Sequence, residues 1–193
     1  MSTLKKLRLS LEELVDEGVT KQEIEYTFFA RCDNMDWINP ELLTEQQEQA
    51  EVHVPLVDNN FGQIRVRSID DSKYELCIKV KLTDELGKRE AEQATTKDMF
   101  DLMLLIAPHS LRKKRYCYPI DGTDLKWEVD VFENAEGVAY NWIKIDLEVN
   151  DPDTVIPEFP IELAEVIMNQ GVQRTEQENK TIETLFDAWA IKR

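Results

Sequence analysis

The sequence has few of the residue types on which many catalytic and metal sites depend. Its 193 residues include two histidines, His53 and His109, and three widely separated cysteines, Cys32, Cys77 and Cys117. The odd number of cysteines and the lack of a CxxC pair indicate reduced thiols and neither a disulfide framework nor a zinc site. Because the two histidines lie in unrelated segments, we interpret them as structural or surface residues. The GxxxxGK[ST], GxGxxG and GxSxG motifs are also missing, which excludes P-loop, Rossmann and α/β-hydrolase sites.

Positive charge and long apolar runs are scarce as well. The chain has 23 Lys and Arg against 39 Asp and Glu, which gives a formal net charge of −16. Nonspecific binding to DNA, RNA or anionic lipid needs an excess of Lys and Arg, so we expect none of these as partners. No apolar run approaches the roughly 18 residues of a membrane span, and the N-terminal MSTLKKLRLS lacks the features of a signal peptide. We therefore expect a cytoplasmic protein.

The sequence is rich in short segments in which apolar and charged residues alternate. Hydrophobic residues make up 42% of the chain, enough for a core, and we predict a single domain over residues 1–193. The alternation predicts strands at 23–31, 51–57, 63–69, 74–82, 88–94, 113–120, 126–132 and 141–149. Capping and periodicity predict helices at 10–17, 40–50, 97–107, about 160–170 and about 176–191, so that residues 150–193 form a helical C-terminal part.

About eight antiparallel strands with short turns favour a closed structure, because closure removes exposed strand edges. We therefore predict an α+β fold in which an eight-stranded antiparallel β-barrel is covered by several helices.

Each predicted strand has one apolar face and one charged face, and like charges cluster strand by strand. In one interpretation the apolar faces fill the barrel and the charged faces meet water. In the other, the charged faces line a water-filled tunnel and helices, including the almost entirely apolar one at 97–107, cover the apolar faces. Like charges two residues apart repel, so the clustering would suit a tunnel that holds polyphosphate and a divalent cation. The charged faces carry Glu23, Glu25, Arg65, Arg67, Lys79, Lys81, Glu90, Glu92, Lys113, Arg115, Glu128, Asp130, Asp146 and Glu148.

The ordered series of charged motifs resembles the CYTH superfamily, named after class IV adenylyl cyclases and thiamine triphosphatases and also called triphosphate tunnel metalloenzymes. EIEYT at 23–27 resembles the family's N-terminal ExExK, RVR at 65–67 its Arg-x-Arg strand, and KVK at 79–81 the basic strand that follows. KREAEQ, KKRY, WEVDVF and IDLEV resemble its later strands, and the resemblance covers roughly residues 22–149. The family's fold is an eight-stranded antiparallel tunnel.

The resemblance implies a division of roles among the charged residues. The phosphate-binding residues would be Arg65, Arg67, Lys79, Lys81, Lys113 and Arg115. The ligands of one or two Mg²⁺ or Mn²⁺ ions would be Glu23, Glu25, Asp130, Asp146 and Glu148. The catalytic residues would be Glu23, Glu25, Arg65, Lys79 and Glu148. The leading hypothesis is metal-dependent hydrolysis of a triphosphate-containing small molecule: a nucleoside triphosphate, thiamine triphosphate or inorganic triphosphate.

Two positions depart from the family's motifs. Asp146 stands where the late strand usually has Glu, which keeps a hard oxygen ligand. Thr27 stands where the first motif has Lys, and a threonine cannot neutralise phosphate charge, although Arg31 or Lys144 could partly replace that lysine. This second departure favours an alternative, a noncatalytic protein that sequesters or senses a nucleotide or polyphosphate. A further alternative is an adenylyl cyclase, in which the ribose 3′-hydroxyl attacks and pyrophosphate leaves.

Overall fold

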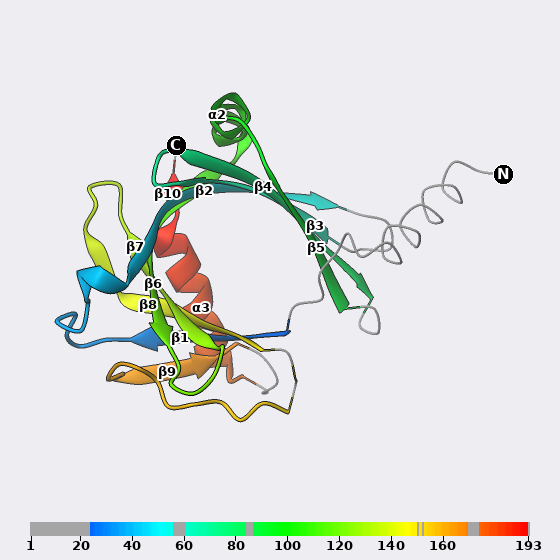
Figure 1. The fold of residues 1–193 in the computed structure, drawn as a ribbon. Coiled ribbons are helices and arrows are strands. Elements are labelled where there is room, and N and C mark those ends of the chain that lie inside the picture. The colour runs from blue at the N-terminus through cyan, green and yellow to red at the C-terminus, as the bar shows by residue number, and fades with distance from the viewer. Residues whose placement is uncertain are drawn as a thin grey trace.

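The computed structural model describes residues 24–55, 61–83, 87–149, 151, 153–169 and 174–192. These residues form one antiparallel ten-stranded sheet with two α-helices and one 3₁₀ turn (Figure 1). The strands are β1 Ile24–Arg31, β2 Leu43–Pro55, β3 Phe61–Ile69, β4 Lys73–Thr83, β5 Gly87–Ala94, β6 His109–Pro119, β7 Lys126–Glu133, β8 Ala139–Val149, β9 Glu165–Met168 and β10 Ile191–Lys192. The helical elements are η1 Pro40–Leu42, α2 Lys97–Ile106 and α3 Glu176–Trp189.

The sheet is strongly curved but open (Figure 1). Its strand order is β5-β4-β3-β2-β6-β7-β8-β1-β9, and β10 pairs with β6. Within the described residues the end strands β5 and β9 do not pair with each other, so the predicted closed eight-stranded barrel is wrong, whereas the α+β class is confirmed. The physical reason is that β9 pairs with the edge of β1 that closure would require, with Phe28 opposite Met168 and Arg31 opposite Glu165.

Helix α2 covers part of the outer face of the sheet. The Thr96 side chain caps its start by accepting a hydrogen bond from the backbone N–H of Met99. Phe100 and Leu104 pack with Ala50 and other apolar side chains of β2, β3 and β4. The prediction that the apolar helix at 97–107 covers the apolar sides of strands is thus confirmed for one side of the helix, whereas its other side, which includes Leu105, is exposed.

Helix α3 lies on the opposite, inner side of the curve (Figure 1). It begins with the predicted capping box of Thr175 and Glu178. Trp189 stacks on Phe132 of β7, with ring centroids 3.9 Å apart and an interplanar angle of 8°, and belongs to one buried cluster with Phe29 of β1. This position corrects the prediction that a terminal helix would cover an apolar strand face. Phe29 and Phe132 interrupt the charged faces of their strands and provide an apolar contact surface there.

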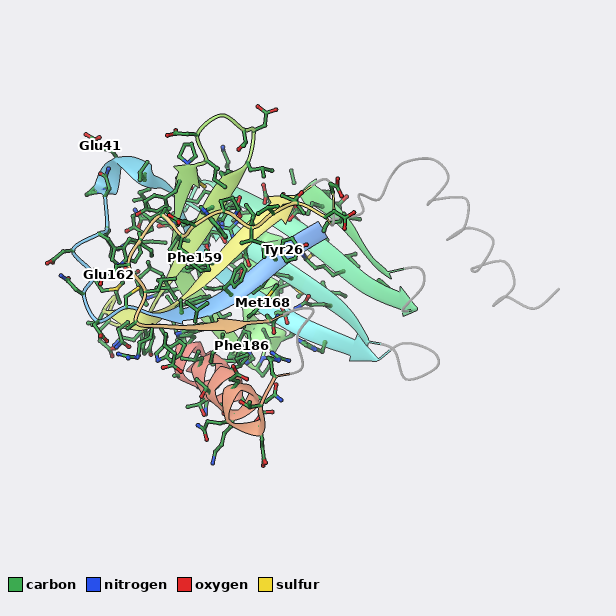
Figure 2. All side chains as sticks on the ribbon, turned by 90° about the horizontal axis from the view of Figure 1, so that it is seen from below. Tyr26, Glu41, Phe159, Glu162, Met168 and Phe186 are labelled. Carbon is green, nitrogen blue, oxygen red and sulfur yellow. The ribbon has the colours of Figure 1, made fainter. Side chains whose placement is uncertain are left out.

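The main core lies on the outer face of β1, β6, β7 and β8, around Trp127 and Ile145. Irregular segments cover it. Phe159 lies with its ring centroid 5.1 Å from both Phe28 and Trp127, and Figure 2 shows it on the segment that crosses this face. The helix predicted at about 160–170 is wrong, because residues 155–163 are irregular and β9 follows. Residues 165–168 instead pair with β1, and this pairing overrides the local helix signal.

The helix predicted at 40–50 is also wrong, apart from its first turn. Asn39 does accept a hydrogen bond from the backbone N–H of Glu41, but the turn ends at Leu42. From Leu43 on, β2 pairs with both β3 and β6, and this pairing overrides the local helix signal. The helix predicted at 10–17 lies outside the described residues. None of the described helices has the length and apolar character needed to cross a membrane.

Candidate functional site

Strand register gathers the charged side chains on the inner face of the sheet. Thr27 of β1 lies opposite Asp146 of β8, which lies opposite Glu128 of β7. One row further along, Lys144 of β8 lies opposite Asp130 of β7. Because side chains two apart share a face, the charged residues of β1, β8, β7 and β6 point to the same side as helix α3.

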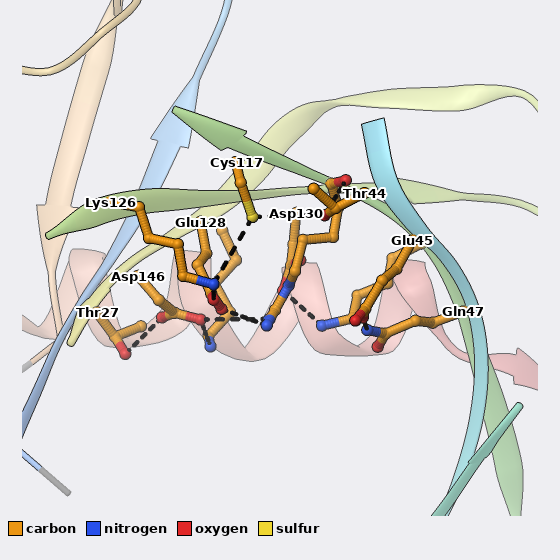
Figure 3. A network of polar contacts seen from close by, with 12 residues as sticks. Thr27, Thr44, Glu45, Gln47, Cys117, Lys126, Glu128, Asp130 and Asp146 are labelled. Carbon is orange, nitrogen blue, oxygen red and sulfur yellow. Dashed lines mark hydrogen bonds and ion pairs between the residues drawn. The ribbon is translucent and has the colours of Figure 1, made fainter. Parts of the chain in front are cut away.

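Asp130 is the centre of this arrangement (Figure 3). Its side chain is fully buried, and Lys113 Nζ donates to its Oδ2 at 2.5 Å. Arg115 donates from Nε to Oδ1 at 2.7 Å and from Nη2 to Oδ2 at 2.9 Å, and it also pairs with Glu128. Both carboxylate oxygens of Asp130 are therefore occupied by cationic donors.

Burial and neighbouring charges shift the pKa values of Asp130 and Lys113 in opposite directions. Burial alone would raise the pKa of Asp130, but Lys113 and Arg115 hold it well below its usual range. Burial, assisted by Arg115 and Lys144, lowers the pKa of Lys113 to about 8, although Asp130 opposes the shift. The carboxylate of Asp130 therefore stays ionised at neutral pH. Of the two groups, Lys113 has the pKa that lies nearer to neutral pH.

Asp146 links this centre to Thr27. Thr27 is buried, and its hydroxyl donates to Asp146 Oδ1 at 2.8 Å. Lys144 donates to Asp146 Oδ2, and Arg115 Nη2 lies 3.9 Å from the same oxygen. An ammonium group therefore does reach the surroundings of Thr27, but it comes from β8. The sequence predicted Lys144 only as a partial replacement for the family's lysine, and its alternation with Asp146 and Glu148 places it on their face of β8.

The other half of the inner face has more accessible carboxylates. Arg67 Nε pairs with Glu75 at 2.6 Å, and Arg67 Nη2 pairs with Glu92 at 2.8 Å. Arg65 Nη2 lies 3.8 Å from the same Glu92 oxygen. The side chains of Arg65 and Arg67 are 19% and 17% exposed, and that of Glu92 is 41% exposed. Lys79 lies on the neighbouring strand β4, opposite Gln63 of β3.

Opposite charges on neighbouring strands correct the prediction that the clustered like charges need bound polyphosphate and a divalent cation as partners. Like charges do recur along each strand, but register places Arg115 against Asp130 and Arg67 against Glu75. The described charges thus largely neutralise one another, and their clustering does not by itself require a bound counter-ion.

The predicted metal ligands are distributed over several strands. Glu25 lies opposite Glu148 at the β1–β8 pairing, and Asp146 follows on the same face. Carboxylate oxygens are the ligands that Mg²⁺ and Mn²⁺ prefer, so the donor chemistry of these three residues suits such an ion. No three acidic, His or Cys residues of the described chain form a ready-made metal cluster. Glu23 lies outside the described residues, as does the side chain of Lys81.

Comparisons with known proteins give structural neighbours only. No family model and no curated protein matches the sequence. Among solved structures, the chain is similar to the inorganic triphosphatase NE1496, with 19% identity, 76% of this chain and 86% of that chain covered, and a TM-score of 0.47. A second structure, of the hypothetical protein NE1496, gives 19% identity, 75% and 88% coverage and the same TM-score of 0.47. The PH1819 protein from Pyrococcus horikoshii OT3 gives 16% identity, 88% and 92% coverage and a TM-score of 0.41.

Proposed function

We propose that the inner face binds a triphosphate-containing small molecule together with Mg²⁺ or Mn²⁺ and hydrolyses its terminal phosphate. The observation that carries this proposal is that cations from β3, β4, β6 and β8 lie on one curved face, where the β3 arginines pair with partly exposed carboxylates that an anion can displace. The resemblance of the strand motifs to the CYTH superfamily supports the same reaction class.

The accessible cations would bind the phosphates. Arg65 and Arg67 carry planar guanidinium groups that can donate two parallel hydrogen bonds to one phosphate, and both are partly exposed. Lys79 would add a compact positive charge from the next strand. Their acidic partners Glu75 and Glu92 are themselves partly exposed, so that an incoming phosphate can compete for the arginines.

The acidic end of the face would hold the metal. Glu25 and Glu148 are the described residues whose carboxylates would coordinate it, and Asp146 would join them only where the ion displaces Thr27 from its Oδ1 atom. The bound ion would neutralise charge on the phosphate oxygens. Lys144, held against Asp146, would stabilise negative charge on the transferring phosphoryl group. Glu25 would orient the attacking water in line with the terminal phosphorus.

Thermal unfolding with different anions tests the binding part of the proposal. Tripolyphosphate should raise Tm more than the same concentration of orthophosphate, because several cations can pair with several phosphate charges. Added Mg²⁺ or Mn²⁺ should then start phosphate release, followed as a time course. Equal, negligible responses of Tm to the two anions would refute the proposal. Formation of cyclic AMP and pyrophosphate from ATP would identify the cyclase alternative instead.

Noncatalytic binding is the second candidate, and the environment of Thr27 favours it. The position that the resemblance assigns to a lysine is a buried threonine whose hydroxyl is committed to Asp146. If binding occurs without turnover, we expect Thr27→Lys to create or raise metal-dependent hydrolysis at matched folded concentration, by as much as about 10³-fold. Brisk hydrolysis by the wild type would eliminate this candidate. A Thr27→Lys variant that folds and binds but hydrolyses no faster would show that Thr27 is not the missing catalytic position.

A further inference from the structure

We infer that the side-chain amide oxygens of Gln47 and Gln49 form a subsite for a hydroxyl or amino group in the organic part of the ligand. The chain would then prefer an organic triphosphate to inorganic triphosphate. This inference rests on the proposed function and narrows its substrate class.

The two oxygens are buried hydrogen-bond acceptors without a donor. Gln47 is 3% exposed and Gln49 is 9% exposed, and neither Oε1 atom has a hydrogen-bond partner. The Gln47 amide donates from Nε2 to Glu45, which fixes its orientation and identifies the remaining atom as the carbonyl oxygen. Buried polar atoms are nearly always paired, so two such oxygens two residues apart on one strand need a specific explanation.

Their place in the sheet makes this subsite part of the inner face. Strand β2 lies at its centre, between β6 and β3. Gln47 lies opposite Lys113 of β6, and Gln49 lies opposite Arg67 of β3. A ligand whose phosphates reach Arg67 would therefore place its remaining atoms beside β2.

The neighbouring cations are held by carboxylates, and none of their N–H groups donates to either glutamine oxygen. Lys113 donates to Asp130 at 2.5 Å, and Arg67 donates to Glu75 at 2.6 Å and to Glu92 at 2.8 Å. Each of these contacts joins a cation to a carboxylate, and a neutral amide oxygen is the weaker competitor for the same donor. The two glutamine oxygens are thus left to accept from a group that the ligand brings.

The chemistry of the two oxygens excludes phosphate itself as the matching group. An ionised phosphate offers acceptors only, whereas hydroxyl and amino groups offer the donors that a carbonyl oxygen needs. Inorganic triphosphate would leave both glutamine oxygens unpaired, and an organic triphosphate could pair them. Sites built to bind a hydroxyl or amino group discriminate strongly against ligands that lack it.

Calorimetric titration of the wild type is the first test, with tripolyphosphate, ATP and thiamine triphosphate as probes in metal-free buffer. We expect at least one organic triphosphate to bind about tenfold to a hundredfold more tightly than tripolyphosphate. The variants Gln47→Met and Gln49→Met keep the side-chain length but remove the acceptor. They should lose this preference while they retain the affinity for tripolyphosphate.

Gln46→Met is the matched control, since Gln46 lies exposed on the same strand, on its other face. It should change neither affinity. The Tm of the ligand-free protein adds a second readout, because removal of an unpaired buried acceptor should leave Tm unchanged or raise it in Gln49→Met. Loss of the preference together with a large fall in Tm in both buried-site variants would indicate a structural role and overturn the inference.

The outcomes separate this inference from the proposed function. If wild-type protein binds tripolyphosphate as tightly as both organic probes, the subsite is refuted while the proposed function stands. If it binds none of the probes, the proposed function fails and the inference fails with it. If Mg²⁺ raises the affinity for tripolyphosphate and for the organic probes equally, and both glutamine variants lose that rise, the oxygens accept from metal-bound water, and the inference is again refuted.

Discussion

The two halves of the inner face use the same residue types in different ways. In the network half, formed by β1, β6, β7 and β8, Lys113, Asp130 and Asp146 are at most 7% exposed; Lys113 pairs with Asp130, and Asp146 pairs with Lys144. In the open half, formed by β3, β4 and β5, the arginines and their glutamates are 17–41% exposed. The alternating pattern is alike in both halves, so the pattern alone does not distinguish a structural ion pair from one that a ligand can displace.

Helix α3 accounts for part of this difference. Its buried cluster includes Phe29 and Phe132, and these residues lie opposite Lys144 and Lys113 in the strand register. The apolar contact excludes water beside the network half, where each charge must then find a protein partner. The helix makes no comparable contact with the described residues of β3, β4 or β5.

Asp130→Asn should give the largest effect, because it removes the anion that holds two buried cations. We expect the free energy of unfolding to fall by about 3–5 kcal/mol. The equivalent change in the open half, Glu92→Gln, should cost less than about 1 kcal/mol. Urea unfolding of the two variants and the wild type measures both. Similar losses for both variants would abolish the distinction between the halves.

The next largest effect should be on the pH dependence of stability, through the lowered pKa of Lys113. Its folded-state pKa of about 8 lies below the unfolded value of 10.5, so the unfolded state binds more protons between these pH values. The wild type should therefore gain stability relative to Lys113→Met as pH rises from about 8 to 10.5, by on the order of 2–3 kcal/mol. Denaturant unfolding at several pH values checks this. A difference between the two proteins that stays constant with pH would show that Lys113 is not desolvated.

Arg65→Gln should affect ligand binding more than stability, because its side chain is in the open half. We expect the affinity for tripolyphosphate to fall by a factor of about 10 to 100, through the loss of charge-assisted hydrogen bonds. Lys73→Gln removes an exposed cation from β4 and serves as the control with the same change in charge. Calorimetry should show little effect of the control, and equal losses in both variants would mean that only the overall charge matters.

Glu75→Gln should give the smallest effect, in the opposite direction. It weakens the contact that occupies Arg67 Nε and leaves that arginine available to phosphate. We expect tripolyphosphate to bind a few fold more tightly. The gain is small because the ion pair that the phosphate no longer has to break contributes less than about 1 kcal/mol. Weaker binding by this variant would show that Glu75 positions Arg67 for the ligand.

Local patterns predict much of this fold, and long-range pairing accounts for the rest. Strands β1, β3, β4 and β7 follow from alternation, and α3 from its capping box. The turn signal at Asn39 and Pro40 was genuine, but β2 has partners on both sides, which no local pattern reveals. The closed barrel was a wrong prediction because β9, which occupies the edge of β1, is only four residues long and too short to show a clear alternation of apolar and polar residues. In the site, alternation identified the face, whereas the pairing of Asp130 with Lys113 and Arg115 depends on register.

The mutual pairing of the inner-face cations has a consequence for association kinetics. Since these cations are balanced by nearby carboxylates, the long-range field of a chain with a net charge of −16 remains negative, and it repels an approaching polyphosphate. Added salt shortens the range of that repulsion. The bimolecular rate constant for an anionic ligand should therefore rise with moderate ionic strength before close-range screening weakens the complex, the reverse of the behaviour of an enzyme that attracts its substrate electrostatically.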